Sequence, residues 1–163
     1  MTQDNAYGSR PDLLPRSLVK VVRASPGSDR LLMWVGQTGV QLLGQEEDLK
    51  YQRESLNCYS HNSSGTIDWE AVDKDLIIYE GDRDDLDPVE LIKRYASNAS
   101  ILVFLWSNAL LPSVRMTSGV AMEKLPGVVQ SIREFWIYSP EDKLVIEYPF
   151  LGSVTVARVC THA

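Results

Sequence analysis

The sequence predicts one α+β domain with a mixed or antiparallel sheet, and three observations support this. Residues 101–106 (ILVFLW) form an unbroken apolar run, which is typical of an interior strand covered on both faces. Residues 87–98 carry helix start signals, and residues 135–159 contain three β-rich segments joined by turns. Strands that cluster at both ends of the chain around a central helix favour the α+β class. A length of 163 residues is typical of one domain.

The N-terminal part begins with a polar segment and then becomes β-rich. Residues 1–16 contain two prolines and a glycine, so we expect a flexible leader followed by a single globular domain over 17–160. Residues 17–24 (SLVKVVRA) predict a strand, and the Ser-Pro-Gly-Ser sequence at 25–28 predicts a turn. Two further β-rich segments, 31–35 and 40–43, flank Gly-Gln-Thr-Gly and predict a β-hairpin.

The next segments give weaker signals. Residues 45–56 are polar with few spaced apolar positions, which fits either a short exposed helix or a loop. Residues 58–65 predict a loop, and residues 66–70 fit either a brief helix or an edge strand.

The helix over 87–98 has the clearest local signals in the chain. Asp87 suits the N-cap, Pro88 the first helical position and Glu90 the third, which completes a capping box, and Asn98 can end the helix. A strand over 75–80 precedes this helix and the buried strand follows it. This order predicts a parallel pair with a right-handed connection.

The C-terminal third ends in a predicted three-stranded antiparallel meander. Pro126 and Gly127 predict a break after the uncertain segment 108–124, and residues 128–133 fit a helical turn. The meander strands are predicted at 135–138, 144–148 and 153–159.

Composition restricts the function classes. The formal charge is −6, from 22 acidic and 16 basic residues, which disfavours nucleic-acid binding and favours a basic protein partner. The chain has no apolar run long enough for a membrane helix and no secretory signal, so we expect a cytosolic protein without a membrane role. Cys58 and Cys160 are far apart in sequence and are expected to be reduced thiols.

Catalytic motifs are absent from the sequence. It contains no GxSxG, P-loop, GxGxxG or HExxH motif, so we expect no catalytic residue, no metal and no cofactor. The Cys58/His61 pair is too close in sequence to indicate a thiolate–imidazole site.

The segment 80–90 is the most distinctive local feature, with six acidic residues and one basic residue. Three interpretations stay open. The carboxylates stabilise the helix N-terminus as a solvated turn, or they form a surface for a cationic partner. The third is a divalent-metal site with Asp82, Asp84 and Asp85 as ligands.

A second acidic patch and one tryptophan are weaker candidates. Glu46 and Glu47 begin the polar segment 45–56, and on a helix Glu46 would face Lys50, so a solvated face is the default. Trp69 lies between acidic neighbours and is the best candidate for an exposed binding anchor. The other three tryptophans lie in β-patterned segments and are expected in the core.

The C-terminal sequence EFWIYSPEDKLVIEY at 134–148, followed by LGSVTV at 151–156, resembles the C-terminal meander of some bacterial immunity proteins. These come from contact-dependent growth inhibition and related toxin systems. The resemblance implies a small, acidic, cytosolic, non-catalytic protein that blocks a toxin domain, often a basic nuclease. It transfers no binding residue, because the matching pattern contains no diagnostic position.

Two main hypotheses follow. The first is an immunity or inhibitor protein that occludes a basic toxin domain. The second is a small metal-assisted enzyme that uses the acidic loop 80–87. An adaptor that adds a strand at an exposed sheet edge is a third, less specific possibility. The partner-binding residues predicted under the first hypothesis are Glu80, Asp82, Asp84 and Asp85, with Glu46, Glu47 and Trp69 as weaker candidates.

Overall fold

The computed structural model describes residues 6–23 and 32–160, and its centre is a seven-stranded sheet. The strand order is β3-β6-β5-β7-β8-β9-β4, and every neighbouring pair is antiparallel. The strands are β3 (Val40–Leu42), β4 (Ile77–Gly81), β5 (Ile101–Trp106), β6 (Val114–Thr117), β7 (Phe135–Ser139), β8 (Leu144–Tyr148) and β9 (Val154–Arg158).

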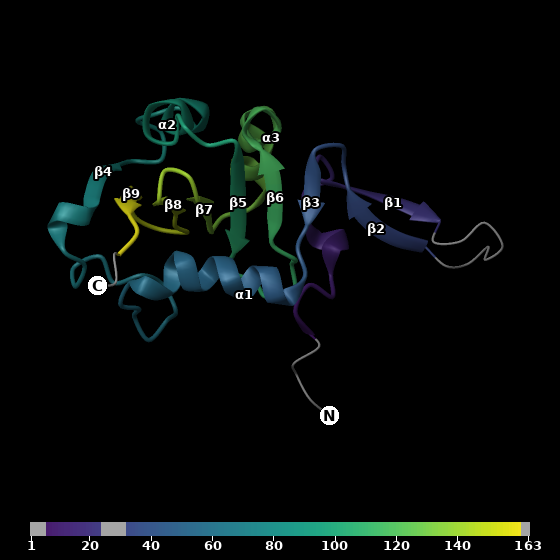
Figure 1. Cartoon of the computed structure of the whole chain (residues 1–163), viewed down its shortest axis with the longest axis horizontal. Coiled ribbons are helices and arrows are strands. Elements are labelled where there is room, and N and C mark those ends of the chain that lie inside the picture. The colour runs from purple at the N-terminus through teal and green to yellow at the C-terminus, as the bar shows by residue number, and fades with distance from the viewer. Residues whose placement is uncertain (1–5, 24–31, 161–163) are drawn as a thin grey trace.

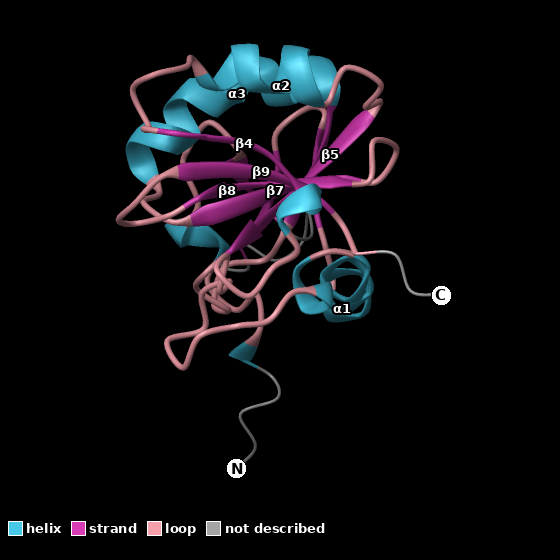
Figure 2. Cartoon of the chain, turned by 90° about the vertical axis from the view of Figure 1, so that its left-hand side faces the viewer, coloured by secondary structure: helices cyan, strands magenta, loops and turns pink. Residues whose placement is uncertain are grey.

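Helices cover both faces of this sheet. Helices α2 (Pro88–Tyr95) and α3 (Ser118–Ser131) lie on one face, and α1 (Gln45–Glu54) lies on the other (Figure 2). The short 3-10 helices are η2 (Pro11–Leu13), η3 (Leu56–Cys58) and η4 (Lys74–Leu76). The α+β class is therefore confirmed, and the sheet is antiparallel.

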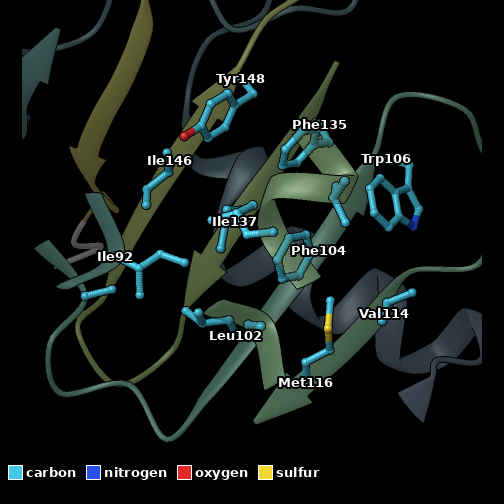
Figure 3. Close-up of a cluster of buried hydrophobic side chains, with 14 of the residues drawn as sticks. Ile92, Leu102, Phe104, Trp106, Val114, Met116, Phe135, Ile137, Ile146 and Tyr148 are labelled. Atoms are coloured by element: carbon cyan, nitrogen blue, oxygen red, sulfur yellow. The ribbon is translucent and has the colours of Figure 1, made fainter. Parts of the chain in front are cut away.

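Strand β5 is the middle of the core, as its unbroken apolar sequence predicts. Its residues alternate between two buried clusters, with Leu102 and Phe104 facing α2 and α3, and Val103 and Leu105 facing α1. The first cluster contains an aromatic row across the sheet, in which the Phe135 ring lies 6.1 Å from Phe104 and 5.0 Å from Tyr148 between centroids (Figure 3). Such a strand, covered on both faces, leaves no room for polar alternation.

Helix α2 begins as predicted, because the Asp87 carboxylate accepts the backbone N–H of Val89 at 2.8 Å. The helix ends at Tyr95, three residues before the expected end at Asn98. The predicted parallel pair is wrong: β4 pairs with β9, and β9, β8 and β7 separate β4 from β5. The meander strands β7, β8 and β9 are joined by short turns, and together they fill the space between β4 and β5.

The predicted hairpin over 31–43 is also wrong. Strand β2 (Leu32–Gly36) pairs with β1 (Val19–Arg23), whereas β3 pairs with β6. The chain turns sharply between β2 and β3, and a Cβ at Gly36 would lie 1.9 Å from the Val40 carbonyl oxygen. The turn therefore sends the two strands into different sheets. The predicted turn at 25–28 lies outside the described residues.

Helix α3 continues through Pro126 and Gly127, where the sequence predicts a break. Proline inside a helix removes one hydrogen bond and costs about 3 kcal/mol. Ala121, Leu125 and Val128 are fully buried on the helix face that packs on the sheet. We attribute the continuous helix to this packing, which offsets the local cost.

Two other segments differ from the sequence prediction, and a third matches one of its alternatives. Residues 66–70 form neither helix nor strand and contribute one isolated bridge, between Ile67 and His61. The expected leader is attached to the body from residue 6 onward: Tyr7 donates its hydroxyl proton to the Leu43 carbonyl at 3.0 Å and Leu14 is buried. Residues 45–56 are largely helical, as one of the two alternatives proposed.

The prediction of two reduced thiols is also wrong. Cys58 and Cys160 form a disulfide, with their Cα atoms 5.6 Å apart, which lies within the range that a disulfide spans. The bond joins η3 to the segment after β9 across 102 residues, a contact that spacing in the sequence does not reveal.

Candidate partner-binding surface

The predicted acidic residues lie at one end of the sheet, on its terminal strand β4 and the turn that follows. Glu80, Asp82, Asp84 and Asp85 are all exposed there, and we call these four residues the acidic edge. The turn is fixed by its own side chain, because Asp85 accepts the backbone N–H of Asp82 at 3.1 Å. This hydrogen bond holds the turn that carries Asp82, Asp84 and Asp85.

Arg83, the single base of the acidic segment, points inward. Its guanidinium donates to the carbonyls of Pro149 at 2.8 Å, Arg133 at 3.0 Å and Val129 at 3.4 Å, and lies 5.4 Å from the Tyr148 ring centroid. In the described part of the chain, no salt bridge joins the acidic edge to a basic side chain. The loop is thus held against the body while its carboxylates face solvent.

Only some of the carboxylates of the segment 80–90 stabilise the N-terminus of α2. Asp87 caps α2, and Glu90 lies in the first turn of that helix. The four acidic-edge residues precede the cap, so helix stabilisation does not account for their charge.

A hollow of about 580 Å³ lies next to the acidic edge, on the α1 face of the sheet. Its charged and aromatic lining comes from Glu80, Glu134, Glu147, Trp69 and Phe150, and we call it the acidic hollow. Strand register explains this grouping, because Glu80 pairs with Thr155, and Thr155 pairs with Glu147. Side chains at directly paired positions lie on the same face of a sheet.

Glu147 is buried, with 4% of its surface exposed. One carboxylate oxygen accepts the Trp69 indole N–H at 2.7 Å, and the other accepts the Trp136 indole N–H at 2.8 Å. Burial raises the pKa of Glu147, and the two indole hydrogen bonds oppose this shift. The negative charge of Glu134 raises the pKa further, whereas His61 lowers it. The hollow therefore holds a carboxyl group whose charged form is disfavoured.

Trp69 is a wall of the hollow rather than the exposed anchor expected from its polar neighbours. Its ring is partly buried and lies 5.3 Å from the Tyr59 ring centroid. The structure nevertheless brings Trp69 and Glu80 to one site, although 11 positions separate them in the sequence.

A second hollow of about 430 Å³ adjoins the first, since Ser64, Thr66 and Glu134 line both. Its lining includes His61 and the buried Asp48. Asp48 accepts hydrogen bonds from the Ser113 hydroxyl and from the Gln52 amide, the latter at 2.8 Å. Asp48 therefore has an internal structural role.

Glu46 and Glu47 lie away from the acidic edge. They begin α1, where Glu47 pairs with Arg115 of β6 at 3.1 Å, whereas the acidic edge belongs to β4 at the other end of the strand order. Glu46 and Lys50 lie one turn apart on α1 and are both exposed, as expected of a solvated face, and the salt bridge of Lys50 is with Glu54 at 3.8 Å. The two predicted acidic patches are thus separate surfaces.

The metal-site interpretation requires converging donor groups. Within residues 6–23 and 32–160, no group of three or more His, Cys, Asp and Glu side chains has a metal-binding arrangement. Asp82, Asp84 and Asp85 therefore do not converge, and Asp85 is occupied by a backbone N–H.

Sequence reasoning missed Glu134 and Glu147. Glu147 follows Val145 and Ile146 in a strand whose residues are all buried, and an acidic residue in such a strand signals a special environment. Its indole partners come from separate segments, so the site itself requires the tertiary structure.

Comparison with known proteins gives no family assignment: no protein-family model matches the chain, and no curated protein shows significant similarity. Among the described helices, none has the length and apolar character needed to cross a membrane.

Proposed function

We propose that this chain is an immunity or inhibitor protein that binds a basic toxin domain and neutralises it by covering its active site. The observation that carries the proposal is the acidic edge: four exposed carboxylates whose neighbouring base, Arg83, donates its hydrogen bonds to the backbone carbonyls of Arg133 and Pro149 in the body. A charged surface of this kind favours a partner with clustered Lys and Arg side chains.

The proposed mechanism is occlusion. A toxin that acts on nucleic acid presents basic groups to the phosphates, and the acidic edge pairs with those same groups. The acidic hollow lies beside the edge, includes Glu134 and Trp69 in its lining, and at about 580 Å³ has room for a long basic side chain. Complementary charge speeds association and makes its rate fall with added salt.

The test is inhibition of the partner's nucleolytic activity by purified protein. We expect inhibition at a 1:1 ratio, and we expect Asp82→Lys combined with Asp84→Lys to slow association about tenfold or more at low salt. These two positions are chosen because Asp85 and Asp87 accept backbone hydrogen bonds and their loss would alter the loop itself.

The matched control is Glu46→Lys combined with Glu123→Lys, which makes the same charge change at two exposed positions on α1 and α3 that are not part of the acidic edge. Equal effects of both pairs would show a general charge effect and contradict the proposed surface. A partner that keeps full activity in the complex would contradict occlusion.

A further inference from the structure

The two strands β1 and β2 form a ribbon that projects from the body beside β3 (Figure 1). Its base is anchored, because Leu18 and Val19 are buried and Arg16 covers the Trp34 ring at 4.9 Å. We call this ribbon the arm.

The arm exposes large apolar side chains. Val21 is 47% exposed, Leu32 59% and Met33 47%. The register places Val21 opposite Trp34 and Met33 opposite Val22, so apolar groups occupy both faces of the ribbon. A two-stranded ribbon is marginally stable alone in water, and clustered exposed apolar groups mark contact surfaces.

Charge is distributed unevenly between the arm and the rest of the chain. Residues 19–36, from the start of β1 to the end of β2, contain three of the 16 basic and one of the 22 acidic residues, which leaves 13 basic and 21 acidic residues elsewhere and gives net charges of +2 and −8. The two strands of the arm carry Lys20 and Arg23 and no acidic residue. The arm is therefore basic and apolar, whereas the remainder of the chain is acidic.

The arm and the acidic edge lie at opposite ends of the molecule. The arm adjoins β3, the first strand in the order, and the acidic edge follows β4, the last (Figure 1). A second copy placed alongside in the antiparallel sense would bring each arm to the acidic edge of the other. A twofold axis closes this arrangement, so two identical contacts form and none is left open.

From these observations we propose that the chain forms a twofold dimer in which the arm of each copy docks on the acidic edge of the second copy. The apolar side chains of the arm are covered in this contact, and Lys20 approaches the carboxylates of Asp82 and Asp84. Direct pairing of two arms is disfavoured, since it would place basic residues against each other. The dimer does not depend on the proposed toxin, although a toxin that binds the acidic edge would compete with the arm.

The experiment is sedimentation velocity of the full chain over a wide concentration range, at low salt and at about 0.5 M salt, where exposed charges are screened. We expect a dimer that weakens at high salt. Lys20→Glu and the pair Asp82→Lys/Asp84→Lys should each weaken dimerisation about tenfold or more. Leu49→Ser, at a position that is 43% exposed on α1, is the control and should leave the dimer unchanged.

Mixing the two charge variants provides a stricter test. In a mixed dimer, the arm that carries Lys20→Glu meets the edge that carries Asp82→Lys and Asp84→Lys. The unaltered arm meets the unaltered edge, so we expect dimerisation to recover. A monomer at every concentration would overturn the proposal. So would a dimer insensitive to Lys20→Glu, or one that keeps its full affinity in the Asp82→Lys/Asp84→Lys variant, as arm-to-arm pairing requires.

Discussion

Glu147 links parts of the chain that are distant in sequence. Its indole partners Trp69 and Trp136 lie 78 and 11 residues away, and each occupies one carboxylate oxygen. Burying a carboxyl group costs free energy unless the group is hydrogen-bonded. The indole N–H groups of both tryptophans are therefore needed to offset the burial of Glu147. The apolar pattern of β7 correctly predicts that Trp136 is buried, but it gives no sign that its N–H serves Glu147.

The Glu147→Gln variant should change both stability and its pH dependence. The amide has one acceptor oxygen, so one indole N–H loses its partner at a cost of about 1–3 kcal/mol. Burial raises the folded-state pKa of Glu147, so its contribution to stability is complete below the unfolded pKa and is lost as pH rises through the folded pKa. The variant should lack this decline.

Urea unfolding at a series of pH values measures both effects, with Glu123→Gln as an exposed control. An identical pH profile for wild type and Glu147→Gln would contradict the assigned role of the buried carboxyl.

Among the helices and strands, short sequence patterns correctly predict those whose formation depends mainly on neighbouring residues. The cap at Asp87, the apolar run of β5 and the meander β7–β9 follow from short sequence patterns. The sequence-based predictions are wrong where contact with a segment distant in the sequence determines the local structure. Strand β3 pairs with β6 across more than 70 residues, and α3 continues through Pro126 because its buried face packs on the sheet.

The disulfide is another contact between residues that are far apart in the sequence. Its reduction should lower the stability of the fold. The bond closes a segment across 102 residues, so reduction should lower the free energy of unfolding by about 2–5 kcal/mol. Thermal unfolding with and without dithiothreitol measures this change. A Cys58→Ser/Cys160→Ser variant should unfold near the reduced midpoint and show no response to the reductant.

Two free thiols in the purified native protein, together with an unchanged midpoint on addition of reductant, would contradict the disulfide. The same double variant controls for effects of the reductant elsewhere in the chain.

For the whole molecule, the sequence predicts an acidic protein but not where its charges meet. It selects Glu80 and Trp69 as site candidates, and the fold brings them to one hollow with Glu134 and Glu147. It also groups Glu46 with the acidic edge, whereas α1 places Glu46 at the other end of the sheet. Charge placement follows from strand order, and strand order depends on pairings between distant segments.

We propose that the acidic edge recognises a basic protein. The most direct measurement is capture of partners from a lysate of the source organism, at low salt and at about 0.5 M salt, with three immobilised proteins. These are the wild type, Asp82→Lys/Asp84→Lys and Glu46→Lys/Glu123→Lys. We predict one basic partner that is retained at low salt by the wild type and the control pair, is weakened at high salt, and is lost with the acidic-edge pair. A partner retained equally by all three proteins, or no partner at low salt, would contradict recognition of a basic protein by the acidic edge.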